Sequence, residues 1–140
     1  MEEIFIEYEE YLNKFRDAQK EYNKVLTKKE QLYKLIYPQS SSIKDTPSNI
    51  STENNSKQQR FVELEEILIK QLNSSKSILG EREYLKKLKE RELRNSTNTM
   101  DIVYVLRYLD RKKVSYIARN LGYSRDNVYK ILTKIKTALQ

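Results

Sequence analysis

The sequence has no cysteine and no histidine, and only two glycines and two prolines among its 140 residues. The first two absences exclude disulfides, thiolate chemistry, histidine-ligated metal sites and histidine acid–base catalysis. No glycine-rich phosphate loop or metal-ligand cluster replaces them, so we expect neither enzyme activity nor a cofactor. The scarcity of glycine and proline, without any alternating strand pattern, predicts an all-α fold.

Long apolar runs are also missing. No stretch approaches the roughly 20 apolar residues that a membrane-spanning helix needs. The first ten residues are acidic and lack the basic leader of a secretory signal. Together with the absence of cysteine, this pattern predicts a soluble, cytoplasmic protein with no membrane partner.

Charge is present in excess and is unevenly distributed. The net charge is +7, yet residues 1–37 carry seven basic and eight acidic side chains. Residues 96–140 carry nine basic and only three acidic side chains. A positive field of this kind attracts phosphate and accelerates encounter with nucleic acid. The asymmetry therefore indicates that the last third of the chain binds nucleic acid.

Residues 1–37 have the pattern of one long amphipathic, coiled-coil-like helix, which Pro38 ends. Apolar and aromatic side chains recur at alternating steps of three and four, interrupted by Gln19 and Lys29. We expect this seam to mediate self-association into a homo-oligomer. Its oligomerisation residues are Phe5, Tyr8, Leu12, Phe15, Tyr22, Leu26, Tyr33 and Ile36.

Residues 38–57 are rich in Ser, Asn and Pro and predict a flexible linker. The helical pattern resumes over residues 58–95, where Gly80 and the polar run 73–77 favour a kink. Two long helices joined by a slack connector predict an antiparallel hairpin. Such a thin hairpin buries little apolar surface, so we expect it to pack on a second copy or another protein.

The segment 96–140 has the pattern of a three-helix domain containing a helix-turn-helix. Asn95–Thr99 is able to cap a helix over Met100–Leu109, and Asp101 suits the first turn of that helix. Gly122 is placed for a tight turn with positive φ, and Ser124 for an N-cap. The buried faces of the two motif helices are predicted to comprise Val114, Ile117, Ala118 and Leu121, then Val128, Ile131, Leu132 and Ile135.

The run LRYLDRKKVSYIARNLGYSRDNVYKILTKIKTAL, residues 106–139, resembles the region-4-like domains of the sigma-70 superfamily. It looks closest to phage and prophage transcriptional regulators from low-GC Gram-positive bacteria, including late-gene and sigma-like regulators. Where that family tends to have Gly before the first motif helix, this chain has Arg111. Where the family tends to have acidic residues, this chain has Ser115, Tyr116, Arg119 and Asn120.

The resemblance implies that the helix beginning at Ser124 reads the major groove of double-stranded DNA. Asp126 either accepts a hydrogen bond from a cytosine or simply caps its helix and stabilises the positive N-terminal end. The residues expected to contact bases are Ser124, Arg125, Asp126, Asn127, Tyr129 and Lys130. Those expected to contact phosphate are Lys112, Lys113, Arg119, Lys134 and Lys136.

Three functions fit these patterns to different degrees. The leading hypothesis is a sequence-specific, prophage-encoded transcriptional regulator that self-associates through its N-terminal helices. The alternative is a sigma-like accessory factor that acts on promoters only when bound to RNA polymerase. A small-terminase-like DNA packaging protein fits less well, because terminases usually place the helix-turn-helix before the coiled coil.

Overall fold

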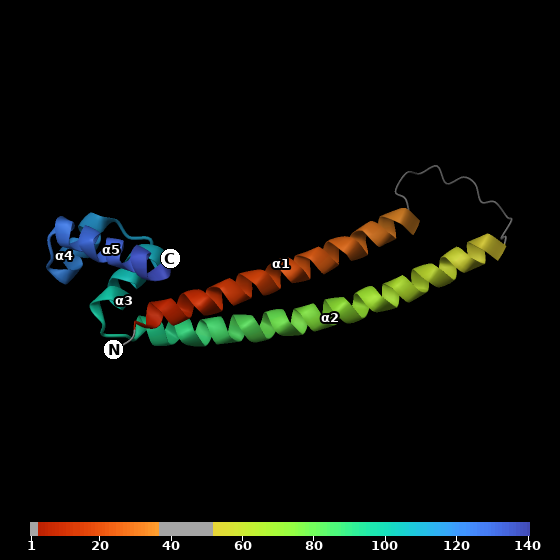
Figure 1. The fold of residues 1–140 in the computed structure, drawn as a ribbon, viewed down its shortest axis with the longest axis horizontal. Coiled ribbons are helices and arrows are strands. Elements are labelled where there is room, and N and C mark those ends of the chain that lie inside the picture. The colour runs from red at the N-terminus through yellow and green to blue at the C-terminus, as the bar shows by residue number, and fades with distance from the viewer. Residues whose placement is uncertain (1–2, 37–51) are drawn as a thin grey trace. The chain divides into compact units, whose positions relative to one another are not determined.

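The computed structural model describes residues 3–36 and 52–140, and every regular element in these two ranges is helical. The all-α prediction is therefore confirmed. In chain order the elements are α1 (Ile4–Ile36), α2 (Thr52–Arg94), α3 (Thr99–Tyr104), the π-helical turn η1 (Val105–Leu109), α4 (Val114–Leu121) and α5 (Arg125–Leu139) (Figure 1).

The chain forms two compact units, and each long helix contributes to both. The middle unit comprises residues 16–81, and the terminal unit comprises residues 1–15 and 82–140. In the middle unit, the Tyr33 ring meets the Phe61 ring edge-on at 5.8 Å between centroids. The Tyr33 hydroxyl donates a hydrogen bond of 2.6 Å to Glu65. These contacts join α1 to α2 within the middle unit.

The second long helix is longer than predicted. It begins at Thr52, so the linker prediction is wrong for residues 52–57, and its remaining part, 38–51, lies outside the described residues. Polar residues cost only tenths of a kcal/mol each in a helix interior, so a nucleated helix propagates through them. For the same reason α2 passes without interruption through residues 73–77 and Gly80, where we expected a kink.

The buried face of α1 departs from the predicted seam after Phe15. Ala18 and Val25 are buried, whereas Gln19 is exposed and Leu26 is only half-buried. Burying the Gln19 amide without partners would cost free energy, and the small neighbouring Ala18 offers apolar surface instead. The side chain of Ile36 lies outside the described residues. The other half-buried members of the predicted seam are Leu12, Phe15, Tyr22 and Tyr33.

The role predicted for Phe5 and Tyr8 also needs correction, because both side chains are buried in the core of their own chain. The Phe5 ring stacks on Tyr104 at 5.3 Å between centroids, and the Tyr8 ring meets Tyr104 edge-on at 6.1 Å. The Tyr104 hydroxyl donates to the carboxylate of Glu9. These two predicted oligomerisation residues therefore hold α1 against α3 and are not available to a second chain.

The carboxylate of Asp101 joins three segments of the terminal unit and is fully buried. It accepts hydrogen bonds from the backbone N–H of Ile4 at 3.2 Å and of Phe5 at 3.0 Å, the first residues of α1. It also accepts a 2.6 Å bond from the Ser96 hydroxyl. The predicted capping segment is confirmed, since Asn98 is the N-cap of α3 and accepts from the Met100 N–H.

An ion pair links α1 to α2 in the terminal unit. The Lys89 ammonium, only 16% exposed, lies 2.5 Å from a Glu7 carboxylate oxygen and 3.1 Å from one of Glu92. The hydrogen bond to Glu7 raises the pKa of Lys89 above its ordinary value, although desolvation opposes it. Because the pKa is raised, this contribution to stability is present at neutral pH and is lost only as the pH rises above about 10.5.

We expect Asp101→Ala to lower the free energy of unfolding by about 2–4 kcal/mol, because two backbone donors and one hydroxyl lose their buried acceptor. Urea denaturation followed by circular dichroism measures this change. The control is Asp17→Ala at an exposed position of α1, which should change stability by less than about 0.5 kcal/mol. Equal denaturation midpoints for the two variants would contradict the role assigned to Asp101.

The two glycines should respond oppositely to the same substitution. Gly80 lies inside α2 with nothing within 4 Å of an added Cβ, so Gly80→Ala should stabilise by about 1 kcal/mol through helix propensity. Gly122 has a φ of 73°, so Gly122→Ala should destabilise by about 1 kcal/mol or more. Thermal and urea denaturation of both variants would check the signs, and a shared sign would be inconsistent with this backbone assignment.

Candidate nucleic-acid interface

The turn between α4 and α5 has the backbone geometry that the sequence predicts. Gly122 adopts the left-handed conformation, with φ 73° and ψ 28°, and the Tyr123 N–H donates to the Ala118 carbonyl at 2.9 Å. Ser124 is the N-cap of α5, and its hydroxyl accepts a 3.1 Å hydrogen bond from the Asn127 N–H. Both predictions, for Gly122 and for Ser124, are confirmed.

The buried faces of α4 and α5 determine which side chains point outward. The side chains of the two helices that are buried in the core of the terminal unit are Val114, Ile117, Ala118, Val128, Leu132 and Ile135. Ile131 and Leu121 pack against the same core but are only partly buried. As a result, every predicted DNA-contacting residue between Lys112 and Lys136 is solvent-exposed. Their contact with DNA remains a prediction.

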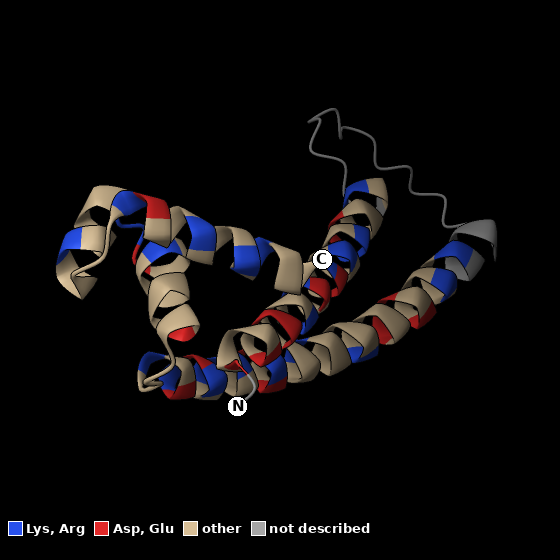
Figure 2. Ribbon diagram, turned by 60° about the vertical axis from the view of Figure 1, so that its left-hand side comes forward, with Lys and Arg blue, Asp and Glu red and all other residues tan. Residues whose placement is uncertain are grey.

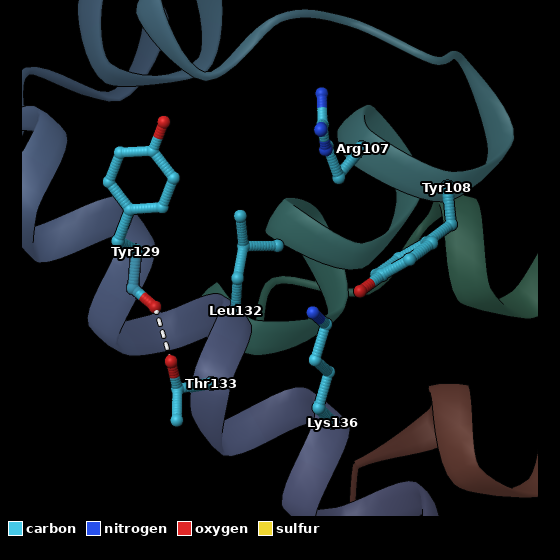
Figure 3. A pocket seen from close by; sticks show the side chains of 6 residues that line it. All are labelled: Arg107, Tyr108, Tyr129, Leu132, Thr133 and Lys136. Atoms are coloured by element: carbon cyan, nitrogen blue, oxygen red, sulfur yellow. Dashed lines mark hydrogen bonds between the residues drawn. The ribbon is translucent and has the colours of Figure 1, made fainter.

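Two adjoining hollows lie between α5 and the η1 turn, and we call them together the η1–α5 groove. The first has a volume of about 290 Å³ and an apolar side chain, Leu132, between cationic and aromatic ones (Figure 3). The second, of about 270 Å³, shares Arg107 and Tyr129 with the first. The residues that line the groove are Arg107, Tyr108, Lys113, Val114, Ser115, Arg125, Tyr129, Leu132, Thr133 and Lys136.

A third hollow, of about 300 Å³, lies on the outer side of α4, and we call it the α4 hollow. Its lining comprises Arg111, Lys112, Lys113, Ser115, Tyr116 and Arg119. The Lys112 ammonium lies 4.9 Å from the centroid of the Tyr116 ring, a cation–π distance. Because Lys113 and Ser115 line both features, the groove and the hollow are adjacent.

The predicted base-contacting residues divide between two sides of α5. Arg125 and Tyr129, four residues apart, line the groove. Asn127, Lys130 and Lys134 line none of these three hollows, and their spacing of three and four places them together on another side of the helix. Asp126 lies between the two sides, in the first turn of α5. Arg125 and Tyr129 therefore face a different direction from Asn127, Lys130 and the predicted phosphate contact Lys134.

The lining of the groove and hollow is cationic. Among the described residues that line them, seven are Lys or Arg and none is Asp or Glu. The sequence of α5 contains four basic residues and one acidic residue, Asp126, and the blue of Lys and Arg is visible along the helix that leads to the C-terminus (Figure 2). The nearby Asp110 carboxylate is engaged by Arg94 at 3.2 Å, and Asp101 is buried. Asp126 is exposed in the first turn of α5, but it lines neither the groove nor the hollow, so the lining itself stays cationic.

Sequence reasoning did not assign six polar or aromatic lining residues to the interface: Arg107, Tyr108, Arg111, Ser115, Tyr116 and Thr133. In η1 the Asp110 N–H donates to the Val105 carbonyl at 2.9 Å, five residues back. Arg107 and Tyr108 belong to this wider turn and line the groove together with residues of α5. The Arg107 guanidinium also donates to the Lys112 carbonyl at 3.0 Å. No periodicity signal marks a π-turn in the sequence.

Arg111 is the only non-glycine residue with positive φ in the described part of the chain, at 55°. This conformation costs an L-residue about 1–2 kcal/mol because its Cβ approaches a carbonyl oxygen. The backbone at this position thus suits glycine, while the chain carries a cation there, in the α4 hollow.

Comparison of the chain with protein-family models, with curated proteins and with solved structures gives no match. Within residues 3–36 and 52–140, no group of three or more acidic side chains is arranged to hold a metal ion. None of the helices in those ranges is both long and apolar enough to cross a membrane.

We expect Arg111→Gly to stabilise the protein by about 0.5–1 kcal/mol, since relief of the left-handed strain exceeds the added entropy of the unfolded chain. Arg111→Lys keeps both the charge and the strain, and should leave stability within about 0.5 kcal/mol of the wild type. Urea denaturation of the two variants measures the difference. A less stable glycine variant would show that the side chain of Arg111 contributes more than its backbone costs.

Proposed function

We propose that this protein is a sequence-specific regulator of transcription that binds double-stranded DNA, with α4 and α5 acting as a helix-turn-helix. The observation that carries the proposal is the cationic lining of the η1–α5 groove and the α4 hollow, which contains no carboxylate among the described residues. The resemblance of residues 106–139 to sigma-70 region-4-like prophage regulators supports the same function.

In this proposal α5 enters the major groove with its capped N-terminus foremost. Arg125 donates two hydrogen bonds to a guanine, and Tyr129 contacts the next base or sugar on the same strand. Asn127 and Lys130, on the other side of α5, face the opposite strand. Asp126 lies in the first turn of α5, where a carboxylate stabilises the positive end of the helix.

Phosphate contacts would lie on both sides of the reading helix. Lys113 and Arg107 lie beside Arg125 in the groove and are placed to hold one strand. Lys112, Arg111 and Arg119 in the α4 hollow extend this cationic surface. Lys134 holds the other strand. Such contacts orient the domain and contribute most of the salt-dependent affinity without reading sequence.

The long helices would serve assembly. We infer that α1 and α2 form an antiparallel hairpin through which two copies associate. A dimer reads two half-sites, so the second binding event becomes intramolecular and overall affinity rises without new contacts.

The experiment begins with selection of genomic fragments by the purified protein, followed by titration of a selected site. Arg125→Ala should weaken binding to that site by about 1–3 kcal/mol and relax preference at one base pair. Lys134→Ala should weaken binding to all sequences and reduce the slope of log affinity against log salt by about one.

The matched control is Lys20→Ala, which removes a charge from an exposed position in the middle unit. It should leave both the affinity and the salt slope unchanged. Unaltered sequence preference in Arg125→Ala would exclude α5 as the reading helix. Diffuse binding by the wild type, without any recovered site, would argue against an autonomous regulator.

The second candidate is a sigma-like accessory factor that contacts promoters only on RNA polymerase. The exposed apolar side chains of α2, including Val62 and Leu64, favour it because another protein would cover them. That function predicts an isolated protein that stays monomeric and binds DNA weakly, and a tighter complex once polymerase is added.

A further inference from the structure

The middle unit leaves apolar side chains uncovered on α2. Phe61, Leu68 and Leu72 are half-buried on one side of the helix. Next to that side, Leu64 is 47% and Ile67 is 51% exposed. Contiguous apolar surface that its own chain leaves uncovered usually marks a contact with another protein.

The spacing of this uncovered surface is that of a helix–helix seam. Arg60, Leu64, Ile67 and Gln71 follow each other at steps of four, three and four, so they form one stripe along α2. All four are exposed. Between residues 60 and 71 the stripe has an apolar centre and polar ends, a composition suited to a short, specific contact; the next exposed apolar residue in the same helical phase is Ile78, seven residues beyond Gln71. We call it the α2 stripe.

The α2 stripe is complementary to itself when a second copy runs antiparallel to it. In that register Leu64 lies opposite Ile67 of the second copy, and by twofold symmetry Ile67 lies opposite its Leu64. Arg60 then lies opposite Gln71 at each end. The apolar layers are therefore central and the polar layers are at the rim, as in specific protein interfaces.

Charges beside the stripe match in the same register. Glu63 and Lys70 are exposed, lie seven residues apart and precede Leu64 and Gln71 directly. Antiparallel pairing places each Glu63 opposite a Lys70, twice per dimer. Parallel pairing would bring Glu63 near Leu68 and Lys70 near Ser75, with no opposite charges. The self-complementary charges fit a second copy of this chain, and they favour the antiparallel sense over the parallel one.

We propose that the protein forms an antiparallel homodimer through the α2 stripe, with reciprocal Glu63–Lys70 ion pairs fixing its register. This inference deepens the proposed self-association by giving its surface and orientation. The dimer itself requires no DNA, so its failure is measured separately from that of DNA binding.

The first test compares two exposed isoleucines of α2 in the full-length protein by sedimentation equilibrium. Ile67→Lys, in the stripe, should raise the dimer dissociation constant by at least about tenfold. Each of the two central layers contains one Ile67, so the substitution places a charge in both layers. Ile69, 37% exposed, is outside the stripe, so Ile69→Lys should sediment as the wild type does. Circular dichroism verifies that both variants remain helical.

The second test reverses charges and does not disturb the apolar layers. Glu63→Lys and Lys70→Glu should each weaken the homodimer on the order of tenfold, since both ion pairs become like-charge contacts. An equimolar mixture of these two variants should restore dimerisation, because every Lys then faces a Glu. Glu66→Lys, exposed and outside the stripe, should have no such effect.

A wild-type protein that remains monomeric at its highest soluble concentration would overturn the proposal, as the polymerase-bound candidate predicts. A mixture of Glu63→Lys and Lys70→Glu that associates no better than either variant alone would also overturn it. Binding of the Ile67→Lys variant to a single half-site reports on DNA recognition independently, because that contact needs only one terminal unit.

Discussion

The terminal unit depends on one buried carboxylate. Asp101 lies in the first turn of α3 and accepts hydrogen bonds from the backbone N–H groups of Ile4 and Phe5. These partners at the start of α1 are 97 and 96 residues away in sequence. A buried carboxylate is costly unless it is hydrogen-bonded, so its position is favourable only when α1 and Ser96 are both in place. The carboxylate interacts favourably with the positive N-terminal ends of two helices. Stacking of Phe5 on Tyr104 accompanies this arrangement.

A chain of aromatic contacts connects the start of α1 to the candidate interface. Tyr104, held between Phe5 and Tyr8, lies 5.1 Å from Tyr108 between ring centroids. Tyr108 lines the η1–α5 groove. Four residues on, beyond the π-turn, Lys112 reaches the α4 hollow. The first turns of α1, far from the groove in sequence, therefore help to determine the shape of the surface that is proposed to bind DNA.

Local features were predictable from sequence, whereas long-range ones were not. Gly122 and Ser124 act through their own backbone and nearest turn, so residue type alone was sufficient. The hydrogen bond between the Ile4 N–H and Asp101 produces no periodic pattern in the sequence. The π-turn that contains Arg107, a residue that lines the groove, has the sequence pattern of an ordinary helix. The burial of Ala18 in place of Gln19 follows from packing between helices, which a single helical period does not encode.

The distance in sequence between Ile4 and Asp101 also constrains how the chain acquires its structure on the ribosome. Until Asp101 has been synthesised, the start of α1 lacks its acceptor, and Phe5 and Tyr8 lack the aromatic partner Tyr104. Non-local contacts of this kind slow folding, because a long loop must close before they form. The N-terminal segment therefore lacks these contacts until Asp101 and Tyr104 have been synthesised, and the terminal unit assembles only after that point.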